Sequence, residues 1–187
     1  MKIRTSLALL AIALLSAALT LAADTAGNWI DIPFVAQSKD GCGSAVISMV
    51  MRYWAKQPEQ RGQAPLDSDP QRIQQLLFVP AEKGIPASAM LSYFQRNGYR
   101  TFAFRGEWSD LRLHISQGRP LIVSLKASGP RGPLHYAVVA GVDWERNYVF
   151  LNDPARGKML RISREGFLQE WSPANNWTLL AVPAAGD

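Results

Sequence analysis

Apolar and polar positions follow two different periods along the chain, and the change falls near its middle. Residues 43–54 carry apolar side chains at helical spacing, and helices are also predicted at 69–78 and 86–97. From Thr101 onward, short apolar runs bounded by turn-forming residues predict β-strands instead. The expected strands are residues 101–104, 120–126, 135–142, 148–151, 158–162 and 177–182, interrupted only by short helices around Leu111 and Phe167. Helices followed by strands predict an α+β fold of two layers, with an antiparallel sheet packed against the first helix.

The first 22 residues have a different pattern from the rest. Lys2 and Arg4 precede an apolar run from Leu7 to Leu15, and small residues follow as far as Ala23. A run of about ten apolar residues is too short for a membrane span, which needs about 20, and is typical of a cleavable secretory signal peptide. We therefore expect a signal peptide at 1–22 and a single domain at 23–187. The expected location is periplasmic or secreted, with no stable membrane span after cleavage.

Composition supports a globular domain and argues against a nucleic-acid partner. The chain has 187 residues, of which 48% are hydrophobic and 19% charged, so it can build a core and is not disordered. Loss of the signal peptide removes Lys2 and Arg4 and no acidic residue, so the net charge falls from +5 to +3. That excess is too small to predict nucleic-acid binding.

The single cysteine, Cys42, is the first candidate for chemistry. An unpaired cysteine in an exported chain is a buried inert thiol, half of an intermolecular disulfide, or a reactive thiol. The helical pattern starts immediately after Cys42, and a helix N-terminus favours the thiolate, which is the nucleophilic form. The neighbouring Gly41 and Gly43 are expected to let a substrate backbone approach the sulfur.

A thiolate nucleophile needs an imidazole, and the sequence offers only His114 and His135. His114 lies in a short amphipathic helix and is assigned no role. His135 follows a Gly- and Pro-rich loop and begins a predicted strand, a position where catalytic groups often lie. We therefore predict that His135 is the base.

A third group is expected to orient the imidazole, and Asp153 is the candidate. A turn near Glu145 predicts an antiparallel hairpin that returns the end of the second strand to the start of the first, which brings Asp153 near His135. Taken alone, Asn152-Asp153-Pro154 also fits an ordinary turn, because these residue types are common in turns.

Together these residues resemble the papain-like cysteine peptidases of the bacteriocin-processing type, whose domains remove double-glycine leader peptides and are usually fused to ABC transporters. The similarity spans residues 30–182 and rests on Gln37, Cys42-Gly43, His135-Tyr136-Ala137-Val138-Val139 and Asn152-Asp153-Pro154-Ala155-Arg156-Gly157. The resemblance implies a papain-like fold in which Cys42 is the nucleophile, His135 the general base and acid, Asp153 the orienting carboxylate and Gln37 an oxyanion-hole donor. The signal-peptide pattern departs from the familiar members, which act on the cytoplasmic side of a membrane.

These features predict an exported cysteine peptidase that acts on a peptide or protein substrate through an acyl-enzyme, with cleavage expected at small residues. The alternative is a peptide-binding module of the same fold that acts in export or assembly without cleavage. Amide hydrolysis or acyl transfer on another substrate, such as cell-wall peptide, also remains open. No His, Cys and acidic cluster has metal-ligand spacing and no phosphate-binding loop is present, so neither a metal nor a cofactor is expected.

Overall fold

The computed structural model describes residues 27–58, 67–126, 129 and 131–184. The predicted signal peptide lies outside these ranges. The helices are α2 (Cys42–Ala55), α3 (Pro70–Leu77), α4 (Ala87–Arg96), α5 (Trp108–Ser116) and α6 (Arg164–Trp171), with short 3-10 turns η3 (Pro80–Glu82) and η4 (Ser172–Ala174). The strands are β1 (Asn28–Trp29), β2 (Tyr99–Arg105), β3 (Leu121–Leu125), β4 (His135–Asp143), β5 (Tyr148–Asp153), β6 (Gly157–Ser163) and β7 (Trp177–Pro183).

The strands form one antiparallel sheet in the order β2-β7-β3-β4-β5-β6, and β1 pairs with β4. The predicted hairpin is present: Asp143 pairs with Tyr148 at its closed end, and Val138 pairs with Asn152 farther along. The α+β class, with three helices before most of the sheet, is confirmed.

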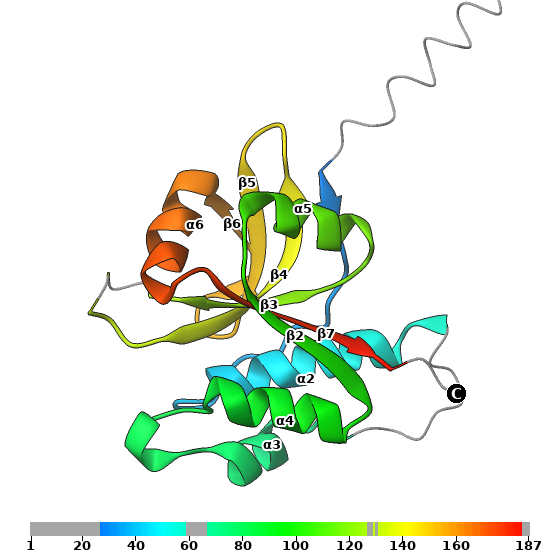
Figure 1. Ribbon diagram of the computed structural model, residues 1–187, viewed down its shortest axis with the longest axis vertical. Coiled ribbons are helices and arrows are strands. Elements are labelled where there is room, and N and C mark those ends of the chain that lie inside the picture. The colour runs from blue at the N-terminus through cyan, green and yellow to red at the C-terminus, as the bar shows by residue number, and fades with distance from the viewer. Residues whose placement is uncertain (1–26, 59–66, 127–128, 130, 185–187) are drawn as a thin grey trace, which may run out of the picture.

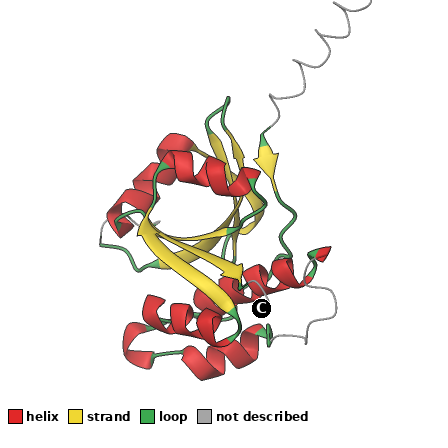
Figure 2. Cartoon of the chain, turned by 45° about the vertical axis from the view of Figure 1, so that its right-hand side comes forward, coloured by secondary structure: helices red, strands yellow, loops and turns green. Residues whose placement is uncertain are grey.

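Helices cover both faces of the sheet, so the prediction of two layers was incomplete. On β4, Tyr136, Val138 and Ala140 pack into a core shared with α2, α3 and α4. Ala137 and Val139 point the other way, into a second core beneath α5 and α6. Figures 1 and 2 show α2, α3 and α4 on one side of the curved sheet and α5 and α6 on the other. A strand buried on both faces reads as a continuous apolar run, which explains the pattern of 135–142.

Local signals in the sequence set the ends of the helices. The Asp69 side chain caps α3 by accepting a hydrogen bond of 2.8 Å from the Arg72 amide, and Pro70 occupies the first turn. Gly98 follows α4 with a φ of 78°, a conformation that glycine adopts without strain. Within the described ranges, no helix combines the length and apolar character needed to cross a membrane.

Candidate active site

Cys42 is the first residue of α2, as the sequence predicts, and its side chain is half-buried. Gly41 is the N-cap residue and provides no side-chain cap, so the first amides of the helix receive no hydrogen bond from the cap residue. The helix packs on β4 and β7, which are central strands of the sheet. Cys42 is therefore held rigidly at the positive end of a buried helix.

The flanking glycines have a packing role that the sequence did not predict. A Cβ atom on Gly43 would lie 2.8 Å from the Cβ of Ile85, and one on Gly41 would lie 2.7 Å from the Ser38 hydroxyl oxygen. Both glycines are buried. They allow the start of α2 to approach its neighbours closely.

His135 and Asp153 meet as the hairpin register predicts. His135 begins β4 and Asp153 ends β5, and the two strands are adjacent and antiparallel. The His135 Nε2 atom lies 2.8 Å from Asp153 Oδ1. Because a carboxylate only accepts, Nε2 carries the proton of this bond, which leaves Nδ1 as the ring nitrogen for a second partner.

Cys42 lies beside this imidazole, and its side chain interacts with His135. Burial disfavours the imidazolium, but hydrogen bonds and charge from Asp153 and Cys42 outweigh burial and raise the pKa of His135 to about 9. The structure thus brings together the predicted thiol, imidazole and carboxylate. This arrangement can exchange a proton between sulfur and imidazole.

Asp153 is fully buried and uses both carboxylate oxygens. Oδ1 accepts from His135 and from the backbone amides of Ala155 and Arg156, at 2.9 and 3.1 Å. Oδ2 accepts from Arg156 Nε at 2.6 Å. Burial opposes ionisation, but the His135 and Arg156 interactions and the Ala155 amide prevail and lower the pKa of Asp153 below its usual 3.8. The carboxylate is therefore charged and fixed beside the imidazole.

Arg156 and Glu170 complete this network, and sequence reasoning did not identify their roles. The Arg156 guanidinium forms a two-pronged pair with Glu170 of α6, with N–O distances of 3.0 and 2.9 Å. A buried carboxylate is stable only when its charge is balanced, so Arg156 is the counter-ion that Asp153 requires. The spacing of Asp153 and Arg156, three residues apart after a strand, was the available signal. Nothing local in the sequence pointed to Glu170.

The backbone of Gln37 contacts the residue that follows Asp153. Its amide donates a 3.1 Å hydrogen bond to the carbonyl of Pro154, the residue after Asp153. The Gln37 Oε1 atom is buried and accepts no hydrogen bond within the described part of the chain. The segment that leads to Gln37 is held by Asn152. This residue is fully buried, and its side-chain amide donates a 3.1 Å hydrogen bond to the Ile32 carbonyl. Asn152 is thus a structural residue as well as part of the turn signal.

His114 lies elsewhere, on α5, which packs on the other face of the sheet from Cys42. Burial, with a contribution from the charge of Arg119, lowers its pKa. It belongs to a separate pocket described below. In the described ranges, no three His, Cys, Asp or Glu side chains are grouped so as to hold a metal ion.

Three solved structures that superimpose on this chain are described as peptidases. The peptidase domain of Streptococcus ComA, a bi-functional ABC transporter involved in quorum sensing, is 21% identical and superimposes with a TM-score of 0.62, over 82% of this chain and 99% of that one. A double-glycine motif protease from an AMS/PCAT transporter, solved with its leader peptide, gives the same identity and TM-score over 84% and 95% of the two chains. A C39-like peptidase from Bacillus anthracis is 13% identical, with a TM-score of 0.64 over 86% of this chain and 100% of that one.

The fold is therefore that of the papain-like cysteine peptidases. The model of the Peptidase_C39 like family matches residues 29–178, so the chain belongs to that family. A search among curated proteins gives no match. The resemblance inferred from the sequence is confirmed at the level of family and fold.

Proposed function

We propose that this protein is an exported cysteine peptidase with Cys42 as nucleophile, His135 as general base and acid, Asp153 as the orienting carboxylate and Gln37 as an oxyanion-hole donor. The observation that carries the proposal is the relay in which His135 Nε2 bonds to Asp153 Oδ1 and Cys42, at the start of α2, interacts with the same imidazole. A module that only bound peptides would not need the thiol in this relay.

The proposed reaction begins with transfer of the Cys42 proton to His135. The Cys42 sulfur attacks the peptide carbonyl carbon, and the Cys42 backbone amide and the Gln37 side-chain amide donate to the oxyanion. His135 returns the proton to the leaving amine, the C–N bond breaks, and a thioester remains on Cys42. His135 then takes a proton from water, whose oxygen attacks the thioester carbon. The C–S bond breaks, His135 returns the proton to the Cys42 sulfur, and the product leaves with a new carboxyl group.

The activity is tested by comparing the mature protein with its Cys42→Ala variant on periplasmic or secreted extract. We expect new substrate N-termini that appear only with the native thiol, read by N-terminal labelling and mass spectrometry. The variant should retain the same substrates as uncut complexes, because recognition survives when the covalent step is lost. Equal partner capture by both forms without any Cys42-dependent product would support a binding module instead.

The assignment of the base is tested with the two histidines of the chain. We expect His135→Ala to abolish turnover and His114→Ala to leave it nearly intact, with circular dichroism verifying that both variants fold. Similar losses in the two variants would contradict the assignment of His135.

Export is tested separately from catalysis. The amino-terminal pattern at residues 1–22 supports secretion followed by cleavage near Ala22 or Ala23. Expression of the full chain in a Gram-negative host should give a periplasmic product whose N-terminus starts near residue 23. Recovery of the uncleaved chain from the cytoplasm would contradict export and leave the peptidase proposal unaffected.

A further inference from the structure

One face of the sheet edge formed by β2 and β7 is not covered by a helix. Arg100 and Phe102 of β2 pair with Val182 and Leu180 of β7, and these side chains share this face with Phe104. The Phe102 side chain is 49% exposed, which is unusual for a large aromatic residue in the middle of a strand. The exposed face is therefore an apolar surface.

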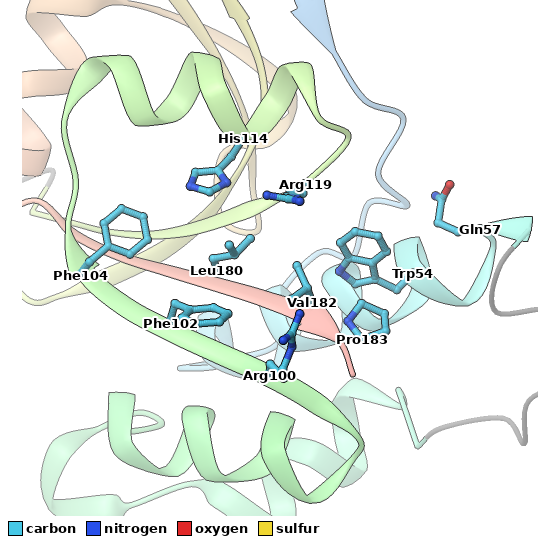
Figure 3. A pocket seen from close by; sticks show the side chains of 10 residues that line it. All are labelled: Trp54, Gln57, Arg100, Phe102, Phe104, His114, Arg119, Leu180, Val182 and Pro183. Atoms are coloured by element: carbon cyan, nitrogen blue, oxygen red, sulfur yellow. The ribbon is translucent and has the colours of Figure 1, made fainter. Parts of the chain in front are cut away.

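The surrounding elements turn this face into a groove of about 700 Å³. In Figure 3, Trp54 from the end of α2 lies at one end, and His114 on α5 lies above Phe104 at the other. The Trp54 ring is fixed because its Nε1 donates to the Ala181 carbonyl at 2.9 Å. The volume falls within the range of about 300–1,000 Å³ that is typical of small-molecule sites.

The described charged residues of the groove have one sign. They are Arg100 and Arg119, and no carboxylate is among the described residues that line it. Neither arginine forms a salt bridge with a described residue. Figure 3 places Arg119 on the α5 side of the groove and Arg100 on the β2 side. Within the part of the chain that the structure describes, the groove thus combines an apolar floor with two guanidinium groups that form no salt bridge.

This groove is separate from the candidate active site. Cys42 and Trp54 occupy opposite ends of α2, and 12 residues at 1.5 Å per residue put them about 18 Å apart along the helix. None of the groove residues belongs to the network around His135 and Asp153. A ligand in the groove would therefore not occupy the position of the scissile bond.

We propose that the groove binds a soluble, single-chain amphipathic carboxylate of the fatty-acid type. The acyl chain lies against Phe102, Phe104 and Leu180 and removes the exposed surface of Phe102 from water. The carboxylate lies against Arg119 or Arg100, whose planar donors match its two oxygens. The alternative occupants, a cationic amphiphile and a purely electrostatic ligand, lack one of these two complementary features.

The proposal is tested by calorimetric titration of the mature protein with dodecanoate below its micelle concentration. We expect saturable binding of one dodecanoate, and no binding of acetate or of dodecyltrimethylammonium. Binding by Cys42→Ala should be unchanged, so a failure of the peptidase proposal would not affect this result. Equal binding of the cationic amphiphile, or no saturable binding of dodecanoate, would overturn the proposal.

Matched variants locate the bound ligand. Arg100→Gln combined with Arg119→Gln should weaken dodecanoate binding at least tenfold, whereas Arg105→Gln, on the other face of β2, should leave it unchanged. Phe102→Ser should also weaken binding about tenfold, and Leu76→Ser on α3 serves as the control for loss of an exposed apolar side chain. Unchanged affinity in both groove variants would place dodecanoate elsewhere and refute the site.

Discussion

The link between Asp153 and His135 makes a quantitative prediction for Asp153→Asn. The asparagine side chain retains an oxygen that can accept from His135 Nε2, but it removes the negative charge 2.8 Å away. Because that charge favours the imidazolium, we expect the pKa of His135 to fall in the variant. Glu170 remains available to pair with Arg156, so the substitution leaves that guanidinium with a partner.

The size of the fall follows from the site. The pKa of His135 is raised from 6.5 to about 9, and this difference of about 2.5 corresponds to about 3 kcal/mol. Asp153 and Cys42 share that stabilisation and also offset the cost of burial. Two charges about 4 Å apart at an effective dielectric of about 20 interact by about 4 kcal/mol, of which Arg156 cancels a part. We therefore expect Asp153→Asn to lower the pKa of His135 by about 1–2.

The measurement is an NMR titration of the imidazole carbon-bound protons in Cys42-containing protein. The chain has two histidines, and their pKa values lie on opposite sides of 6.5, because burial lowers that of His114. The two signals can be assigned with His114→Gln. In Asp153→Asn the His114 titration should not move, which makes it an internal control for folding.

Asp143→Asn provides the matched control. Asp143 is also mostly buried and pairs with an arginine three residues later, Arg146, at 3.1 Å, but it lies at the tip of the hairpin away from His135. We expect no change in the His135 titration in this variant. A His135 titration that stays near pH 9 in Asp153→Asn would refute the proposed coupling.

Two further predictions concern stability. Gly43→Ala should lower the free energy of unfolding by about 1–3 kcal/mol, because its methyl group would overlap Ile85, whereas Gly84→Ala, with nothing closer than 3.9 Å, should have little effect in urea denaturation. The pKa of Asp153 is lowered below 3.8, so its ion pairs stabilise the fold above pH 3.8, and this stability is lost as the pH falls through the lowered value. Arg156→Gln should reduce the free energy of unfolding at pH 7 by about 2 kcal/mol and make the loss of stability below pH 3.8 shallower, as followed by denaturation at each pH.

The site residues that could be predicted from sequence are those placed by local rules. Helical spacing after Cys42 fixed the start of α2, and the turn near Glu145 fixed a hairpin whose register brings His135 to Asp153. The position of Cys42 depends on one helix, and the contact between His135 and Asp153 depends on two consecutive strands. Such arrangements depend little on the rest of the fold.

The missed features depend on contacts between elements distant in the chain. The role of Gly43 is set by Ile85, which is 42 positions away and approaches α2 only after α3 has folded back. Likewise, α6 covers the second face of the sheet, where Glu170 meets Arg156. Hydrophobic periodicity predicts which face of α6 is buried, but it does not predict that the helix packs beside the end of β5.

The need for charge balance explains why α6 contributes to the candidate active site at all. Asp153 can orient His135 only as a fully buried anion, and a buried anion without a counter-ion would take up a proton. Arg156 supplies that counter-ion, but a flexible arginine fixes the carboxylate only if its own guanidinium is held. Glu170 holds the guanidinium by accepting two hydrogen bonds from Arg156. Cys42 lies on α2, which packs on one face of the sheet, and Glu170 lies on α6, which packs on the other. The relay therefore depends on both helical layers being docked on the same sheet.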